Sequence, residues 1–274
     1  MTATTTHVPS GRAKAIPLRP RSALAIALVS IVGVIGFAWP LFITADSTLA
    51  SHTNDAPLLF ALMLPLLLAV VLSEVSEGGI DSKAIAMLGV LSAVDAMMRP
   101  LGAGTGGIEV MFFLLVLSGR VFGAGFGFVL GCTSMFASAI LTAGIGPWLP
   151  FQMLGAGWIA LGAGLLPPLR GRAEIFMLIG YGIISSLLYG WILNFYFWPL
   201  GTTGEPAISV VPGGPLLTNL KHFLAFNLAT SLGWDLGRAI TTSVLIAITG
   251  RPILLTLRRA SRKAAFGRPT SLAD

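Results

Sequence analysis

Charge is scarce in this chain, and the scarcity decides which class of protein it belongs to. Only 10% of the 274 residues are charged, 55% are hydrophobic, and the mean hydropathy is +0.86. A soluble globular domain carries roughly a quarter charged residues. The apolar runs are continuous rather than alternating, which excludes membrane-spanning strands and favours helices. The chain is therefore predicted to be an all-α integral membrane protein.

Cysteine and the common catalytic motifs are also nearly missing. Cys132 is the single cysteine, so no intrachain disulfide can form, and the three histidines are far apart in sequence. No metal site or other cofactor is predicted from them. The chain contains no G-x-x-x-x-G-K-[ST], H-E-x-x-H or G-x-S-x-G motif. We therefore expect neither ATP hydrolysis by this chain nor another enzymatic activity.

The hydrophobic segments predict eight transmembrane helices, with a basic tail at each end of the chain. The helices cover roughly residues 22–44, 57–74, 82–98, 107–119, 121–144, 149–167, 173–198 and 219–250. We expect a disordered basic cytoplasmic tail at 1–21, two additional transmembrane helices in 22–81, a six-helix substrate-binding core at 82–255 and a basic cytoplasmic tail at 256–274. The predicted fold is thus a six-helix bundle preceded by two extra helices.

The distribution of basic residues predicts the orientation in the membrane. With the N-terminus inside, all of the 17 Lys and Arg residues except Arg99, Lys221 and Arg238 fall in cytoplasmic segments. This is a strong positive-inside bias, and the opposite orientation would invert it. A multi-pass protein of the cell membrane with both termini in the cytoplasm is predicted.

A glycine-rich turn at residues 99–109 joins two helices that are too short to cross a bilayer comfortably. Polar backbone groups of such a turn must be buried in protein or line a cavity, because lipid cannot satisfy them. Interrupted helices of this kind point to a binding site. Gly102, Gly104 and Gly107 match G-x-G-x-x-G, but no strand precedes them, so a dinucleotide site is rejected.

Aromatic and amide side chains gather toward the outer ends of the later helices, and they predict an outward-facing pocket for a neutral organic ligand. Interfacial anchoring is the alternative for the outermost aromatic residues. The predicted substrate-binding residues are Arg99, Gly104, Gly106, Glu109, Trp148, Gln152, Trp191, Asn194 and Asn227.

Several ionisable residues lie within or at the ends of the predicted spans. Asp235 and Arg238 are three residues apart, so a helix places them on one face as an intramembrane ion pair. The pair either fixes the last helix against the bundle or takes part in conformational coupling. Asp95 is predicted to pair with Arg99, and Glu109 to favour the N-terminus of the helix that it opens.

Small residues recur at helical spacing, as in Gly119, Gly123, Gly127 and Gly131. Such stripes allow close helix packing, either inside the bundle or against another membrane subunit. The residues predicted to dock a partner are Gly89, Ala93, Gly119 and Gly123, while Gly127 and Gly131 are expected to pack internally.

Three segments together resemble the substrate-specific S components of energy-coupling factor (ECF) transporters. They are residues 112–127 (FFLLVLSGRVFGAGFG), 144–153 (GIGPWLPFQM) and 226–238 (FNLATSLGWDLGR). The cobalamin-type S components are the most similar. The family's first core helix usually carries Ala-x-x-x-Ala for docking, where this chain has Gly89-x-x-x-Ala93.

The resemblance implies a subunit that captures a vitamin or related micronutrient from outside. Its partners would be a transmembrane coupling subunit and two cytosolic ATPase subunits that drive uptake. Two other classes remain open from the residues alone. An independent secondary transporter or channel should show buried ionisable groups along a path, and a membrane scaffold protein should lack a polar outer cavity.

Overall fold

Apolar helices make up the part of the chain that the computed structural model describes, namely residues 18–41, 63–69, 71, 82–102, 105–201 and 205–264. Within these ranges there is no β-strand. Five helices are long and apolar enough to cross a membrane. The prediction of an all-α, multi-pass membrane protein is confirmed at this level.

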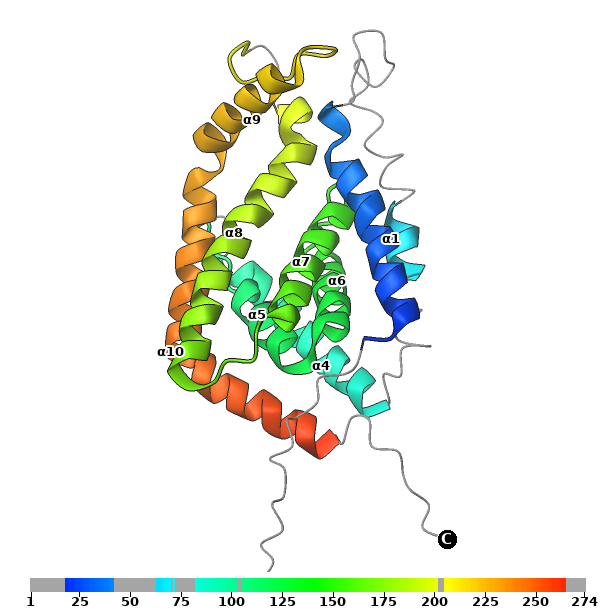
Figure 1. The fold of residues 1–274 in the computed structure, drawn as a ribbon, viewed down its shortest axis with the longest axis vertical. Coiled ribbons are helices and arrows are strands. Elements are labelled where there is room, and N and C mark those ends of the chain that lie inside the picture. Colours follow the sequence, from blue (N-terminus) through cyan, green and yellow to red (C-terminus); the bar gives the residue numbers. More distant parts are fainter. Residues whose placement is uncertain are drawn as a thin grey trace, which may run out of the picture.

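Figure 1 shows the helices packed into one bundle. They are α1 (Pro20–Phe37), α4 (Ser82–Met98), α5 (Met111–Phe122), α6 (Ala124–Leu141), α7 (Leu149–Leu165), α8 (Gly171–Gly201), α9 (Leu216–Thr230) and α10 (Leu232–Ala264). Short 3-10 helices cover Trp39–Leu41 and Arg99–Gly102. The predicted second span is described only at residues 63–69 and 71, which are helical, and the rest of it lies outside the described residues.

The α5, α6 and α7 helices form the centre of the bundle, and glycine lets them approach closely. Gly123 alone separates α5 from α6, at a φ of 97° that favours glycine. A Cβ on Gly119 or Gly127 would collide with the backbone of Ala160 in α7. The glycine stripe is therefore divided between two helices, and Gly119 and Gly123 are both buried.

The first helix packs against α7. The Trp158 indole Nε1 donates a hydrogen bond of 2.8 Å to Ser30 Oγ of α1. The ring centroids of Phe37 and Phe151 are 4.8 Å apart in an edge-on arrangement. Helix α1 is therefore joined to the central helices by both a polar and an aromatic contact.

The predicted last span, 219–250, is two helices rather than one. Helix α9 ends at Thr230, and its C-cap residue Ser231 donates its backbone N–H to the Asn227 carbonyl. Helix α10 begins at the next residue, Leu232. The apolar pattern continues across this junction, so hydropathy alone does not reveal the break.

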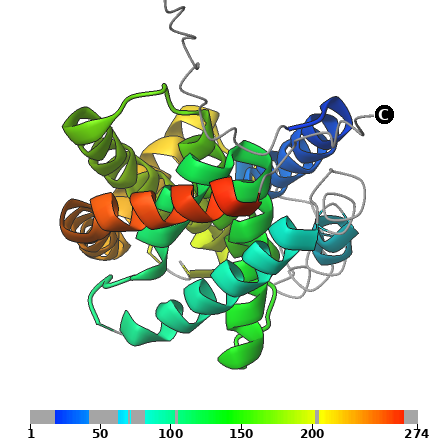
Figure 2. The same cartoon turned by 90° about the horizontal axis from the view of Figure 1, so that it is seen from below.

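Helix α10 also extends past the predicted core boundary at residue 255, because the helix continues to Ala264. Its last turns cross the lower end of the bundle (Figure 2). Leu254, Leu257 and Ser261 are buried, while Arg259 and Arg262 are exposed. The predicted tail is thus an amphipathic helical end up to Ala264, and residues 265–274 lie outside the described part.

Candidate binding site

A chain of polar side chains runs along the junction of α9 and α10. Asn194 of α8 donates its side-chain amide to Asn227 Oδ1 of α9. Ser231 Oγ lies 3.0 Å from Asn227 Oδ1 and 3.0 Å from Asp235 Oδ2. A hydroxyl has a single proton, so it can donate to one of these two acceptors at a time. The Ser231 hydroxyl can therefore switch its hydrogen bond between Asn227 and Asp235.

Arg238 ends this chain and binds two carboxylates. Its Nη1 lies 2.9 Å from Asp235 Oδ1, and its Nη2 lies 2.7 Å from Glu109 Oε1. Nη1 also donates to the Ser186 carbonyl of α8 at 3.0 Å. The guanidinium lies 5.0 Å from the centre of the Tyr189 ring, within cation–π range. One buried guanidinium therefore joins α8, α10 and the turn before α5.

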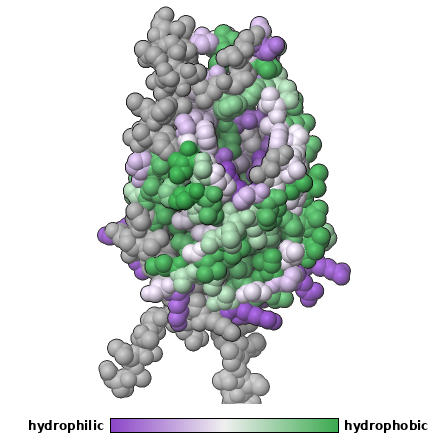
Figure 3. Space-filling model, turned by 180° about the vertical axis from the view of Figure 1, so that it is seen from behind, coloured by the Kyte–Doolittle hydropathy of each residue, from purple (hydrophilic) through white to green (hydrophobic). Residues whose placement is uncertain are grey.

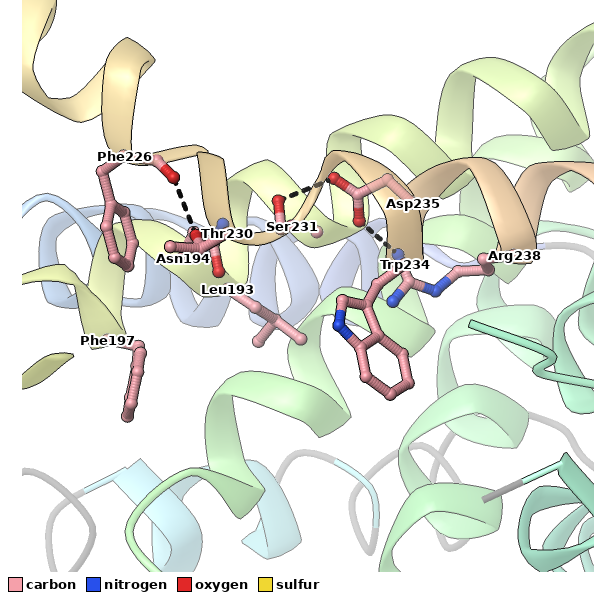
Figure 4. A pocket seen from close by; sticks show the side chains of 10 residues that line it. Leu193, Asn194, Phe197, Phe226, Thr230, Ser231, Trp234, Asp235 and Arg238 are labelled. Carbon is pink, nitrogen blue, oxygen red and sulfur yellow. Dashed lines mark hydrogen bonds and ion pairs between the residues drawn. The ribbon is translucent and has the colours of Figure 1, made fainter. Parts of the chain in front are cut away.

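A cavity of about 340 Å³ opens beside these groups. Its walls are Gly190, Leu193, Asn194, Phe197, Phe226, Thr230, Ser231, Trp234, Asp235 and Arg238. Figure 4 shows Ser231, Asp235 and Arg238 in a row along the junction, with the rings of Phe197 and Trp234 projecting toward open space. Figure 3 shows hydrophilic side chains in a recess between apolar surfaces. The cavity combines an ionic edge with aromatic walls.

Glycine residues allow the backbone to approach this site. A Cβ on Gly190 would collide with the Asp235 carboxylate, so glycine lets α8 lie directly against α10 there. A Cβ on Gly107 would collide with the Trp234 carbonyl, and one on Gly237 with the Gly106 carbonyl. The 105–107 part of the predicted glycine turn therefore packs on the first turns of α10, next to the cavity.

The predicted site residues fall into two groups. Asn194 and Asn227 are joined at the cavity, whereas Arg99 Nη2 donates to Gln152 Oε1 at 3.0 Å and ties the turn after α4 to α7. Tyr189 is buried and lies within electrostatic range of both Arg99 and Arg238. The predicted site residues therefore form two separate hydrogen-bonded pairs rather than one cluster.

Other predicted residues lie apart from the cavity. Trp148 and Trp191 do not line it, and 47% and 37% of their surfaces are exposed. The interfacial role that was the alternative for Trp148 suits this exposure. Gly106 is exposed at a φ of 49° in the turn, and Gly104 lies outside the described residues.

Two predicted interactions of carboxylates are wrong. Asp95 does not pair with Arg99: it is fully buried and forms no ion pair within the described residues. Glu109 does not cap a helix, because α5 begins at Met111 with Val110 as its N-cap. In both cases the partner comes from a distant part of the sequence: the Gln152 amide of α7 binds Arg99, and Arg238 of α10 binds Glu109.

The four predicted docking residues do not share one surface. Gly89 and Ala93 are exposed on α4, and a Cβ on Gly89 would have no atom within 4 Å. Gly119 and Gly123 are buried inside the bundle and present no outer face.

Sequence reasoning missed the residues that build the cavity around the amides, chiefly Ser231 and Trp234. A detectable signal was present. Asn227, Ser231 and Asp235 are four residues apart, so a helical frame places three polar side chains on one stripe of an otherwise apolar segment.

Comparisons of the chain with family models, with curated proteins and with solved structures find no significant match. The function must therefore be argued from the site itself.

Proposed function

We propose that this chain is the substrate-binding membrane subunit of an ECF-type importer, which captures a vitamin or related micronutrient from outside the cell. The observation that carries the proposal is the cavity at the junction of α9 and α10. An interrupted membrane helix that presents polar groups to a cavity is a recurrent way to bind a solute within the bilayer. A simple scaffold protein would need no such cavity.

The dimensions and chemistry of the cavity favour a small ligand. Its volume of about 340 Å³ lies at the lower end of the roughly 300–1,000 Å³ typical of small-molecule pockets. This favours a vitamin much smaller than cobalamin, the ligand that the sequence resemblance suggested. The polar side chains of Asn194, Ser231, Asp235 and Arg238 line one edge of the cavity and offer hydrogen-bonding groups to a ligand. Trp234 and Phe197 offer flat apolar faces to a ring.

Energy for uptake would come from other subunits under this proposal, because the sequence contains no phosphate-binding loop. A transmembrane coupling subunit and two cytosolic ATPases are the proposed partners. The exposed α4 face around Gly89 and Ala93 is the proposed contact with the coupling subunit. The protein would lie in the cell membrane with both termini in the cytoplasm.

The test is to purify the protein from cells grown in vitamin-rich medium and to identify bound small molecules by mass spectrometry. We expect a vitamin-sized compound in the wild-type protein, and at least a tenfold lower occupancy in Asn194→Leu. Trp191→Leu, on the same helix but outside the cavity, should keep the ligand. Equal occupancy in Asn194→Leu, or no bound compound from any medium, would contradict the proposed site.

One observation favours an independent secondary transporter as the second candidate. Asp95 is a fully buried carboxyl in α4 that forms no ion pair within the described residues, and such groups often belong to ion pathways in membranes. Uptake by the purified chain alone in vesicles, driven by an ion gradient and lost in Asp95→Asn, would favour this candidate over the first.

A further inference from the structure

A second cavity lies at the opposite end of α8 and α10, where no candidate site was predicted. Its volume is about 420 Å³. It is lined by Gly171, Arg172, Glu174, Ile175, Arg251, Leu254, Leu255 and Arg258. The cavity forms where the first turn of α8 meets the part of α10 that contains Pro252.

The charges of this cavity are unbalanced. Glu174 is buried and is bound by Arg120 Nε at 2.7 Å and by Arg258 Nη2 at 2.6 Å, so its charge is already compensated. Arg172 and Arg251 are exposed and form no ion pair within the described residues. Two guanidinium groups therefore face the same cavity without an anion. Guanidinium groups bind phosphate oxygens in bidentate geometry.

The cavity is placed at the end of two apolar spans, which is the level of lipid headgroups. Large apolar side chains are exposed on the same two helices close to the cavity: 72% of Phe176 and 71% of Ile248 are accessible. Leu255 lines the cavity and is 46% exposed. Figure 3 also shows hydrophilic side chains gathered at this lower end of the helices. A ligand here meets arginine on one side and apolar surface on the other.

We propose that this cavity binds the phosphate of an anionic phospholipid, with the acyl chains lying along the exposed apolar side chains of α8 and α10. Basic pockets between membrane helices are suited to anionic headgroups. An acidic peptide would use the arginines but would leave the adjacent apolar surface unused. The inference does not depend on the identity of the transported solute.

The test is a titration of the purified full chain with phosphatidylglycerol, followed by native mass spectrometry of the retained lipid. Phosphatidylcholine and inorganic phosphate are the comparison ligands. We expect phosphatidylglycerol to bind more tightly than either. Arg172→Gln and Arg251→Gln should each weaken its binding about fivefold, a size typical of one basic residue at an anionic surface. Arg259→Gln is the matched control, because Arg259 is exposed on the same helix but does not line the cavity.

Three results would overturn the proposal. They are equal retention of phosphatidylcholine and phosphatidylglycerol, binding of inorganic phosphate as tight as that of the lipid, and a loss of binding in Arg259→Gln as large as in the cavity variants. The first would show no preference for an anionic headgroup, the second would identify a free-anion site, and the third would indicate diffuse surface charge. Because Arg172 and Arg251 are exposed, each single variant is expected to fold, and an unchanged thermal unfolding midpoint verifies this.

Discussion

At the scale of single residues, Arg238 determines how the candidate site is held together. Its side chain is 7% exposed, and it contacts two carboxylates that come from different segments of chain. Taking charges out of water is costly, so a buried pair is tolerated when its partners are well placed. Removing one partner leaves the other charge buried and uncompensated. The burial of Arg238 is therefore tolerated because Asp235 and Glu109 compensate its charge, and their charges in turn need Arg238.

Arg238→Gln should lower the free energy of unfolding by ~3–5 kcal/mol, because Asp235 and Glu109 lose their shared counter-charge. The measurement is thermal unfolding in detergent micelles. Arg259→Gln, which removes an exposed arginine from the same helix, should leave the unfolding midpoint nearly unchanged. The double variant Asp235→Asn/Arg238→Gln should be more stable than the sum of the single effects predicts, because the orphaned carboxylate is gone. Strict additivity would show that the two side chains are not coupled.

Asp95 should behave differently from Asp235. It forms no ion pair within the described residues, so Asp95→Asn removes a potential charge from the bundle without breaking an ion pair. The unfolding midpoint is expected to stay equal to wild type or to rise, since asparagine has nearly the same shape. A fall comparable with that of Asp235→Asn would mean that the Asp95 carboxylate has a stabilising ionic partner.

At the scale of helices, the break at Ser231 and the glycine contacts matter most. The break places Asn227 and Asp235 at the ends of two helices, with a serine hydroxyl between them. Glycine then lets α8 and the 105–107 turn approach the same region. These features bring donors and acceptors from separate segments into one cavity.

The central glycines should be far less tolerant of substitution than the one on α4. Gly119→Leu forces a side chain into the Ala160 backbone, so it should destabilise the fold by about 3 kcal/mol, near the upper end for overpacked cores. Gly89→Leu places its side chain in open space and should fold normally. Size-exclusion profiles and thermal unfolding in detergent compare the two. A stable, monodisperse Gly119→Leu protein would contradict the close packing of α5 on α7.

Much of the helical arrangement could be predicted from the sequence, because long apolar runs impose helices in a membrane. The Asp235–Arg238 spacing likewise placed two charges on one helix face. The break at Ser231 could not be predicted from hydropathy, since the segment around it contains neither proline nor a long polar run. The partners of Arg99 and Glu109 depend on α7 and α10, which are distant in sequence. Spacing along the sequence therefore predicted the wrong partners, namely Asp95 for Arg99 and a helix N-terminus for Glu109.

At the scale of the whole molecule, the two cavities lie at opposite ends of the same helix pair. The α8 and α10 helices carry the first cavity at the junction with α9 and the second near Arg172 and Arg251. The α8–α10 contact between them includes Gly182, which faces Thr242, and Gly190, which faces Asp235. A shift of one helix along the other would alter both ends. This arrangement suits a protein that must release its ligand when a partner acts at a distance.

The outer face of α4 is the proposed site of that partner. Gly89 and Ala93 are exposed there beside Val90 and Met97, whose side chains are 61% and 58% accessible. Small residues between larger apolar ones allow a second helix to approach closely. Ala93→Leu should therefore reduce co-purification with the coupling subunit at least tenfold.

The same variant should leave the cavity intact, because Ala93 is exposed and no residue of α4 lines the cavity. Ligand occupancy of the isolated Ala93→Leu protein should match wild type, while ATP-dependent uptake in vesicles containing all subunits should be lost. Val90→Leu, which keeps a large apolar side chain at an exposed position, is the control and should retain both activities. If Ala93→Leu still associates and transports normally, this face contacts lipid alone. The coupling subunit would then have to dock on another exposed helix, with α1 the first to be examined.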